Sequence, residues 1–285
     1  MAGLDRMGST TLRLWRLAGY LAWTLPLMPV QALGLLLKQP WTATLPRFYH
    51  RICCRILGIR IRRIGEPTAL RPTLYVANHI SYLDITALGS VLSGGFIAKA
   101  EVARWPLYGW LAKMQRCVFV DRQVRSTAEQ RDAIADRLAA GDGLILFPEG
   151  TSHDGNRILA FKSALFAAAM HPDVVVQPVS VTYTRLNGLP IGRGFRPLFA
   201  WYGDMAMAPH LWRMLGLGTL EIEIEFHRPT SFAECGSRKA LAAYCEAQVI
   251  AGVNTARTGH RPPLPAPEPD RLEPVGAELP AAANG

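Results

Sequence analysis

The chain has 285 residues, of which 49% are hydrophobic and 19% charged, and its formal net charge is +9. One folded domain with a hydrophobic core and appendages is expected. The basic excess suits nucleic acid, an anionic membrane or a phosphorylated substrate, but the basic stripe interleaved with aromatic residues that marks a nucleic-acid binder is not evident, so no nucleic-acid partner is predicted. The five cysteines include no C-x-x-C pair and favour neither a zinc site nor a disulfide framework.

The first feature along the chain is an uncharged stretch over residues 17–37, long enough to cross a bilayer. Pro26 and Pro29 would kink or break a helix there, so two shorter helices inserted into one leaflet are an equal alternative. A signal peptide cleaved after Ala32 is a third interpretation. Under either of the first two, the stretch is expected to hold the protein at a membrane.

Basic residues crowd directly behind this stretch, among them Arg47, Arg51 and Arg55. Such a cluster favours the cytoplasmic leaflet and argues against export. Residues 47–57 mix basic and apolar side chains as a helix at a membrane surface does, although an ordinary packed helix whose arginines reach solvent fits as well. We therefore predict a membrane anchor and interfacial helix over residues 1–58, at the inner (cytoplasmic) membrane, with the folded domain on its cytoplasmic side.

Short apolar runs alternate with amphipathic segments through the next part of the chain. Strands are expected near residues 59–64, 74–77, 96–98, 117–120, 143–147 and 174–183, and helices near residues 85–92, 105–111 and 161–170 and between 126 and 141. This alternation predicts an α/β fold with a mixed, partly parallel sheet flanked by helices, over residues 59–256. Residues 257–285 are rich in Pro, Ala and Glu, and we expect them to be a disordered tail.

Residues 73–84, TLYVANHISYLD, combine a strand end with a helix start. Ser81 followed three residues later by Asp84 is a helix N-terminal signal. His79 and Asp84 are five residues apart, too far for neighbours on one helical face, but a bend from strand to helix can bring them together. A carboxylate on one imidazole nitrogen fixes the tautomer and leaves the other nitrogen free to take a proton. The pair is therefore a candidate general base; alternatively, Asp84 only caps its helix and His79 is a turn residue.

Two further strand ends carry polar residues. Arg122 follows one predicted strand, and Glu149, Gly150 and Thr151 follow another. If these strands are parallel neighbours of the first, their ends converge on one edge of the sheet. Arg122 would then offer a fork of donors to an anionic headgroup, and Gly150 would let backbone amides approach a phosphate. Thr151 would add a hydroxyl, and Glu149 would orient a polyol hydroxyl. A surface arginine, a tight turn and a capping threonine are the alternatives.

In four motifs the sequence resembles the glycerolipid acyltransferases of the 1-acylglycerol-3-phosphate acyltransferase group. The motifs are His79 with Asp84, residues 118–122 (VFVDR), residues 147–151 (FPEGT) and residues 177–180 (QPVS). They occur in the family's order, which makes the resemblance far more specific than any one of them.

Two departures from the family pattern bear on the acceptor. Arg116 stands where the second motif usually opens with Gly, and Ser152 with His153 stands where the third often continues with Arg-Ser. The tract over residues 151–157, together with residues 201–204, looks more like the branch that acylates lyso-ornithine lipid, so that lipid, alone or with 1-acyl-sn-glycerol-3-phosphate, is the expected acceptor. An enzyme strictly making phosphatidic acid is the alternative. The further headgroup contacts expected on this basis are Asn78, Lys99, Arg157 and Arg193, with Asp154 or Asp204 against an ammonium group.

The resemblance also implies a reaction. His79 would take the proton from the free hydroxyl of the acceptor, and the alkoxide would attack an acyl thioester of acyl carrier protein or coenzyme A. Asp84 would hold and polarise His79, and general-base help of this kind contributes about 10²–10⁴-fold. Neither a cofactor nor a metal is expected, and the absence of a G-x-S-x-G pattern in the sequence argues against a serine hydrolase.

Two other classes of function stay open. A metal-dependent phosphoesterase could use His79, Asp84, His153 and Asp154, although their spacing matches no ligand pattern that we can name. A non-catalytic basic membrane adaptor would explain the charge and the apolar N-terminal part, but it would not explain the polar residues at the strand ends.

Overall fold

The computed structural model describes residues 8–120, 128–171 and 173–260. The strands are β1 (Ile59–Ile64), β2 (Thr73–Ala77), β3 (Gly95–Lys99), β4 (Val118–Val120), β5 (Gly143–Leu146), β6 (Val175–Leu186), β7 (Leu189–Pro190), β8 (Leu220–Phe226) and β9 (Thr230–Ser231). The α-helices are α1 (Thr10–Leu36), α2 (Leu45–Leu57), α3 (Leu83–Val91), α4 (Tyr108–Met114), α5 (Ala128–Ala139), α6 (Arg196–Phe199), α7 (Met207–Gly216), α8 (Phe232–Cys235) and α9 (Arg238–Thr258). The 3₁₀ helices are η2 (Pro40–Ala43), η3 (Ala100–Arg104) and η4 (Ser163–Met170).

The strands in the described part of the chain form one sheet, with the main path β1-β8-β6-β2-β5-β3-β4 and with β7 and β9 paired to β6. The run from β6 through β2, β5 and β3 to β4 is parallel, β8 is antiparallel to β6, and β1 is parallel to β8. This mixed, partly parallel sheet flanked by helices confirms the predicted fold class. Because β2, β5 and β3 are parallel neighbours, their carboxyl ends lie on one edge, where α/β proteins bind ligands.

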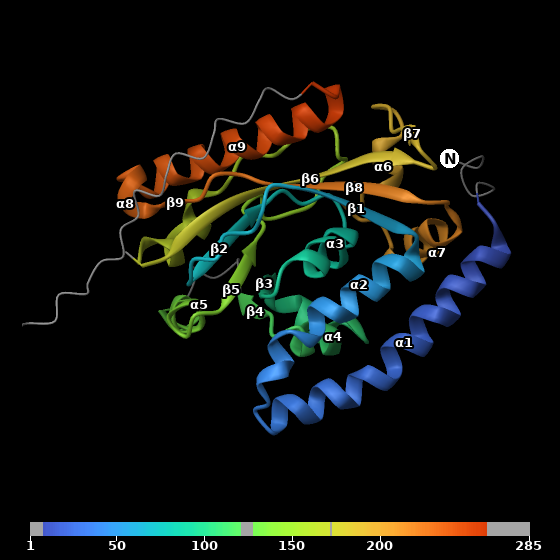
Figure 1. The fold of residues 1–285 in the computed structure, drawn as a ribbon, viewed down its shortest axis with the longest axis horizontal. Helices are drawn as coiled ribbons and strands as arrows, with labels where there is room; N and C mark the ends of the chain where they lie inside the picture. The colour runs from blue at the N-terminus through green and yellow to red at the C-terminus, as the bar shows by residue number, and fades with distance from the viewer. Residues whose placement is uncertain (1–7, 121–127, 172, 261–285) are drawn as a thin grey trace, which may run out of the picture.

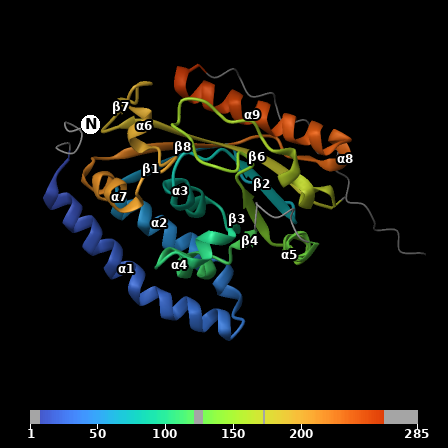
Figure 2. The same cartoon turned by 180° about the vertical axis from the view of Figure 1, so that it is seen from behind.

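Both faces of the sheet are covered. In β2, Tyr75 and Ala77 belong to a core shared with α2, α3 and α7, whereas Leu74 and Val76 belong to a second core shared with α5 and α9. The alternation follows from the period of two along a strand. All five residues of β2 are buried, as expected for a parallel strand between two helical layers. Figures 1 and 2 show α9 on one side of the sheet and α1 to α4 on the other.

Helix α1 lies beside the domain and contacts α2, α4 and α7 (Figure 1). It runs through Pro26 and Pro29 as one helix, so the break considered from the sequence does not occur. By length and composition it is a candidate membrane span, and only 17% of its most apolar window is buried inside the protein.

Two polar residues fasten α1 to the domain near its two ends. The Arg16 guanidinium donates to the carbonyl oxygens of Leu215, Leu217 and Gly218 at the end of α7 and in the loop that follows it. Near the other end, Gln31 donates to the carbonyl oxygens of Thr42 and Met114, both at 2.9 Å. Helix α1 is therefore held against the domain near both of its ends.

The C-terminal part differs from expectation at one boundary. Helix α9 runs on to Thr258, so the boundary predicted at residue 257 falls inside it, and Arg257 is held by bonds to the carbonyl oxygens of Gly155 and Asn156. Most of the predicted tail, residues 261–285, lies outside the described residues. The segment expected as a helix near residues 161–170 is the 3₁₀ helix η4.

Candidate active site

His79 lies in the short loop that connects β2 to α3. Strand β2 is paired with β5 in the register Val76↔Leu146, so the residues that follow these two strands emerge side by side. As a result the His79 ring stacks on Phe147, with ring centroids 4.1 Å apart and planes inclined by 17°. The strand ends that carry His79 and the Phe147-Pro148-Glu149-Gly150 turn therefore converge, as expected for parallel neighbouring strands.

Asp84 lies in the first turn of α3 and is completely buried. Its Oδ2 accepts hydrogen bonds from His79 Nδ1 at 2.9 Å and from the backbone N–H groups of Ile80 at 2.6 Å and Ser81 at 2.9 Å. Its Oδ1 accepts a hydrogen bond from the phenol of Tyr183 at 2.7 Å. The carboxylate thus holds the turn and the imidazole at once, so capping and orienting His79 are not alternatives.

The geometry around His79 defines its tautomer. With Nδ1 donating to the Asp84 carboxylate, Nε2 of the neutral ring is the lone-pair nitrogen, and no described residue forms a hydrogen bond with it. The side chain keeps 19% of its surface exposed. An oriented imidazole with one accessible basic nitrogen can take a proton from a bound hydroxyl group.

Glu149 holds the same loop through a hydrogen bond to its backbone. Its Oε1 accepts the backbone N–H of His79 and its Oε2 that of Leu159, both at 2.8 Å, and His153 Nε2 lies 3.1 Å from Oε2. The side chain of Glu149 is buried. These contacts favour a positioning role for Glu149 over the contact with a substrate hydroxyl expected from the sequence.

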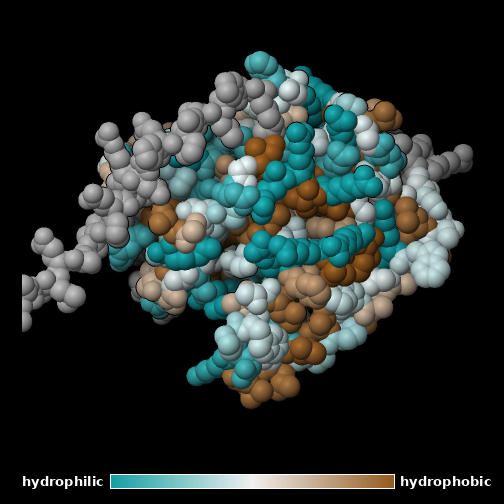
Figure 3. All heavy atoms as spheres, in the orientation of Figure 1, coloured by the Kyte–Doolittle hydropathy of each residue, from teal (hydrophilic) through white to brown (hydrophobic). Residues whose placement is uncertain are grey.

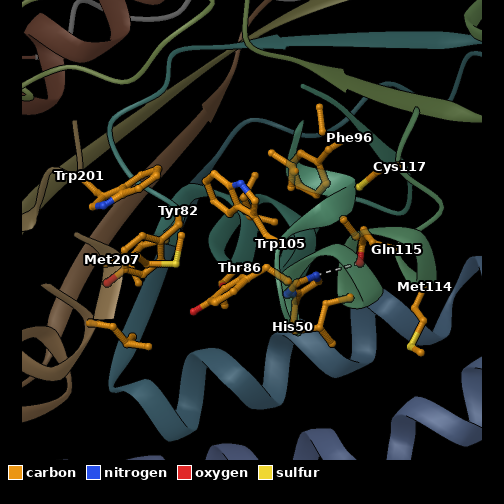
Figure 4. Close-up of a pocket in the computed structure, with 18 of the residues that line it drawn as sticks. His50, Tyr82, Thr86, Phe96, Trp105, Met114, Gln115, Cys117, Trp201 and Met207 are labelled. Atoms are coloured by element: carbon orange, nitrogen blue, oxygen red, sulfur yellow. Dashed lines mark hydrogen bonds between the residues drawn. The ribbon is translucent and has the colours of Figure 1, made fainter. Parts of the chain in front are cut away.

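A cavity of about 420 Å³ opens beside His79. This is within the usual range for small-molecule sites, roughly 300–1,000 Å³. Its walls come from α1, α2, α3, α4, α7, β3, η3 and the loops at residues 150–152 and 201–203. Apolar side chains dominate the lining, among them Leu17, Leu27, Met28, Leu45, Leu83, Ile85, Phe96, Val102, Leu111, Leu211 and Leu215. Figure 4 shows Tyr82, Trp201 and Met207 on one side of it and His50, Gln115 and Met114 on the other.

Of the other residues expected at the site, three line the cavity: Lys99, Gly150 and Thr151. Lys99 and Thr151 are exposed. Gly150 has φ +77°, a conformation that favours glycine, and its N–H donates to Phe147 O at 3.2 Å, so this amide already has a partner.

Asn78 has a different place from the one expected. It is completely buried, and its side-chain amide pairs with the backbone of Val181, donating to the carbonyl at 2.9 Å and accepting from the N–H at 2.8 Å. Asn78 therefore extends the pairing of β2 with β6 beyond the end of the strand. This role does not leave it available as a headgroup contact.

Two of the expected arginine contacts do not line the cavity. Arg157 and Arg193 are exposed and lie outside its walls. Strand β4 ends on the same sheet edge as β3, but Asp121 and Arg122 lie outside the described residues, and the role of Arg122 stays a prediction.

Sequence reasoning missed the residues that hold His79 and Asp84 in place. Tyr183, which binds Asp84, comes from β6, and Phe147, which stacks on His79, was noticed only as part of a motif. A buried tyrosine has to satisfy its hydroxyl group, so a tyrosine within the apolar run of β6 was a usable signal. Ser152 donates to Trp201 O at 2.5 Å, which places side by side the two tracts that resemble the ornithine-lipid branch.

Comparison with known proteins agrees with this geometry. Residues 60–182 match the model of the family described as Acyltransferase. A lyso-ornithine lipid O-acyltransferase of Brucella abortus is 44% identical over 86% of this chain and 95% of its own length. One from Rhizobium meliloti is 44% identical over 77% of this chain and 78% of its own length. A 1-acyl-sn-glycerol-3-phosphate acyltransferase of Neisseria gonorrhoeae is 33% identical over 67% of this chain and 73% of its own.

A solved structure shares the fold. The crystal structure of the 1-acyl-sn-glycerophosphate acyltransferase from Thermotoga maritima superimposes with a TM-score of 0.54 at 25% sequence identity, covering 74% of this chain and 78% of that one.

Proposed function

The chain belongs to the acyltransferase family, and on that premise we propose that it esterifies the free hydroxyl group of lyso-ornithine lipid with a fatty acyl group from an acyl thioester, in membrane lipid biosynthesis. The observation that carries the reaction type is the His79–Asp84 pair at the wall of an apolar cavity. The relatives named for lyso-ornithine lipid support the acceptor, since they are more similar to this chain than the Neisseria enzyme.

The reaction follows from the free nitrogen of His79. Nε2 takes the proton of the acceptor hydroxyl group. The oxygen of that hydroxyl group forms a bond with the carbonyl carbon of the thioester at the same time. Collapse of the tetrahedral intermediate breaks the C–S bond, and the thiolate takes the proton from the imidazolium. The acyl group passes directly from the thioester sulfur to the acceptor oxygen, without a covalent intermediate on the protein.

Asp84 makes this cycle favourable at both stages. Before attack, its Oδ2 holds Nδ1–H and so keeps the lone pair on Nε2. After attack, the carboxylate lies beside the imidazolium and stabilises its charge. The backbone donors from Ile80 and Ser81 prevent the carboxylate from turning away.

Two charged side chains at the cavity suit the ornithine headgroup, which carries a carboxylate and an ammonium group. Lys99 at the end of β3 and Glu101 in η3 both line the cavity and are both exposed. Lys99 supplies a cation for the carboxylate and Glu101 an anion for the ammonium group. A phosphate headgroup would meet the lysine favourably and the glutamate unfavourably, which supports the zwitterionic acceptor.

We further propose that α1 lies in the membrane surface and does not cross the bilayer. Arg16 and Gln31 fasten its two ends to the domain, so a spanning orientation would carry polar parts of the domain into the hydrocarbon. Large apolar side chains on the outer face of α1 are exposed, among them Leu14, Trp15, Leu25, Val30, Leu33 and Leu36. Figure 3 shows hydrophobic residues gathered where α1 ends, below a hydrophilic ridge that lies over α2.

In this arrangement the apolar face of α1 would dip into one leaflet. Arg47, Arg51 and Arg55 on α2 would then lie near anionic headgroups of the cytoplasmic leaflet. The lysolipid can move from that leaflet into the cavity, whose wall α1 helps to form. The thioester donor, acyl carrier protein or coenzyme A, would arrive from the cytoplasm.

The test is an activity assay of the purified full-length chain. The acceptor is either lyso-ornithine lipid or 1-acyl-sn-glycerol-3-phosphate, and each acceptor is tested with an acyl thioester of acyl carrier protein and with one of coenzyme A. We expect mass spectrometry to detect diacylated ornithine lipid as the preferred product. Acylation of the phosphate acceptor alone would overturn the proposed acceptor, and no transfer to any lysolipid would overturn the reaction.

A further inference from the structure

Four arginines from separate parts of the chain gather outside the cavity. This arginine cluster consists of Arg157 from the loop after β5, Arg193 and Arg196 from the segment after β7, and Arg257 from the end of α9. Asn156 joins two of them: its side-chain oxygen accepts a hydrogen bond from Arg196 at 3.4 Å, and its carbonyl oxygen accepts one from Arg257 at 3.0 Å. None of the four lines the cavity, so any ligand of the cluster binds outside it.

Two contacts place the arginine cluster beside the loop that carries His79. A Cβ added to Gly155 would lie 3.4 Å from Cγ2 of Ile80 and 3.6 Å from Cβ of Arg196. Helix α6 begins at Arg196 and leads to Trp201, whose backbone N–H donates to the carbonyl oxygen of Ile80 at 3.1 Å. Ile80 follows His79 directly. The cluster is therefore close to the reacting groups although it is not part of the cavity wall.

The positive charge of the arginine cluster is not balanced by neighbouring carboxylates. None of the four guanidinium groups forms an ion pair with a described residue. Asp154, in the same loop, is turned to Asn156: its Oδ1 accepts the backbone N–H at 3.0 Å and its Oδ2 the side-chain amide at 3.2 Å. Burial, and next the charge of Arg193, lower the pKa of Arg196, and burial, and next the charge of Arg196, lower the pKa of Arg257 to about 10. Arginines that are held together and remain charged at neutral pH suit an anionic ligand.

The side from which the cluster is reached favours the acyl donor over the lipid acceptor. Arg257 ends α9, which covers the sheet face opposite to α1 (Figures 1 and 2). In the proposed arrangement α1 lies on the membrane and the lysolipid enters from that side, so the cluster is directed away from the lipid surface. The thioester of either donor is carried on a pantetheine arm, which is uncharged along its length and ends in a phosphate group. That phosphate remains outside the cavity when the thioester reaches His79.

We propose that the arginine cluster binds the phosphate group at the end of the pantetheine arm of the acyl donor. The inference rests on the proposed function, because it takes the donor to be an acyl thioester. Acyl carrier protein and coenzyme A share this phosphate. Guanidinium groups bind phosphate oxygens through paired hydrogen bonds. Arg157 and Arg193, which are exposed and form no hydrogen bond with a described residue, are available for this contact.

The test is a binding measurement that needs no transfer. S-hexadecyl-4′-phosphopantetheine and S-hexadecylpantetheine are thioethers that carry no acyl group and differ only in the phosphate. Each is titrated into the purified full-length chain at fixed detergent concentration. Quenching of tryptophan fluorescence reports binding, because Trp105 and Trp201 line the cavity. We expect the phosphate-bearing compound to bind about tenfold more tightly, the size of one hydrogen bond to a charged group, and we expect this preference to decrease at high salt.

A double variant assigns the preference to the arginine cluster. Arg157→Gln/Arg193→Gln removes the two exposed guanidinium groups and leaves Arg196 and Arg257, which hold the loop at Asn156, in place. It should keep the melting temperature of the wild type, bind S-hexadecylpantetheine as the wild type does, and bind the two thioethers with nearly equal affinity.

The matched control makes the same change in net charge elsewhere. Arg228 and Arg238 are exposed, and Arg238 begins α9, roughly 30 Å along the helix from Arg257. Arg228→Gln/Arg238→Gln should therefore keep the wild-type preference for the phosphate.

Kinetics with the two natural donors identify the source of the phosphate. Hexadecanoyl thioesters of acyl carrier protein and of coenzyme A are compared at saturating lysolipid. Arg157→Gln/Arg193→Gln should raise KM for the donor with kcat nearly unchanged, because His79 and Asp84 are untouched. An increase for one donor alone identifies that donor as the one whose phosphate binds the cluster. An increase in KM for the lysolipid, with none for either donor, would mean that the cluster binds a lipid headgroup and would overturn the inference.

Equal binding of the two thioethers by the wild type would overturn the inference, and so would a preference that survives in Arg157→Gln/Arg193→Gln. A chain that transfers acyl groups but does not distinguish the two thioethers refutes only this inference. One that prefers the phosphate-bearing thioether but transfers nothing refutes only the proposed function.

Discussion

The phenol of Tyr183 donates a 2.7 Å hydrogen bond to Asp84 Oδ1, the carboxylate oxygen that does not bind His79. Burial, and next the neighbouring Asp84 carboxylate, raise the pKa of Tyr183 well above its ordinary value of 10. The phenol therefore remains a donor over any working pH. It links strand β6 to the start of α3 and so to the His79–Asp84 pair.

Tyr183→Phe removes this donor and leaves one oxygen of a buried carboxylate unpaired. A hydrogen bond to a charged group is worth about 1.5–3 kcal/mol. Because Asp84 orients His79, we expect kcat to fall at least about tenfold with little change in KM. Steady-state kinetics measure this. Tyr244→Phe is the control, since the Tyr244 phenol donates to the Arg228 carbonyl on the surface; if both variants keep wild-type kcat, Tyr183 does not support the pair.

His79→Ala and Asp84→Asn separate general-base chemistry from helix capping. His79→Ala should lower kcat by about 10²–10⁴-fold. In Asp84→Asn the amide carbonyl oxygen could still accept the backbone N–H groups of Ile80 and Ser81, so the turn should persist, but the side chain lacks the charge that stabilises an imidazolium. This variant should therefore fold with a nearly unchanged melting temperature and lose activity severely. Activity that survives in Asp84→Asn would leave capping as the role of Asp84.

The sequence predicted the parts of the fold whose hydrophobic pattern is local. The strand before His79 and the helix after it follow from the apolar run and the Ser81-x-x-Asp84 signal, and the structure places both there. Between residue 183 and the tail no strand or helix was expected, although LEIEIEF in β8 alternates as a strand does. Its pairing between β1 and β6 depends on contacts far apart in sequence, which a local pattern does not contain.

For the site, the motifs identified two residues that the structure brings together, His79 and Asp84, but not what each neighbour does. Asn78 and Glu149 follow strand ends and look available to a ligand, yet both are buried and bound to backbone groups. Spacing shows that a polar residue lies at a strand end; only the packing around it shows whether its atoms face the cavity or the loop that supports it.

A dependence of stability on pH is expected from His50. Burial lowers its pKa from 6.5 to about 4 in the folded protein. As the pH falls below 6.5 the unfolded chain gains this proton and the folded protein does not, so stability is lost between pH 6.5 and pH 4, by about 3 kcal/mol. Thermal melting at pH 7 and pH 5 should show a smaller decrease for His50→Leu/Gln115→Met than for the wild type; equal decreases would contradict it.

Membrane attachment through the outer face of α1 is expected to depend on a few exposed side chains. Leu33 and Leu36 are 57% and 78% exposed. Replacing both by Glu places two charges in the face that would be immersed, so the variant should sediment with membranes much less than the wild type does. The wild type should resist extraction by high salt, because burial of apolar surface is not screened. Leu189→Glu is the control: Leu189 is 72% exposed but lies in β7, and its replacement should not release the protein.

Lys99 and Glu101 provide the sharpest test of the acceptor, because their neutralisation has opposite expected effects. Lys99→Gln removes the cation for either headgroup, and it should raise KM more for 1-acyl-sn-glycerol-3-phosphate, whose phosphate carries the larger negative charge. Glu101→Gln removes the anion that would meet the ornithine ammonium group. It should raise KM for lyso-ornithine lipid and lower it for the phosphate acceptor, since a like-charge repulsion is relieved.

Both side chains are exposed, so changes in KM of about threefold to tenfold are expected, consistent with weak exposed pairs. Because neither residue contacts the His79–Asp84 pair, kcat should be preserved with both acceptors. If Glu101→Gln shifts KM equally for the two lipids, Glu101 does not read the headgroup, and the charge argument for the ornithine acceptor fails while the acyl-transfer chemistry at His79 remains.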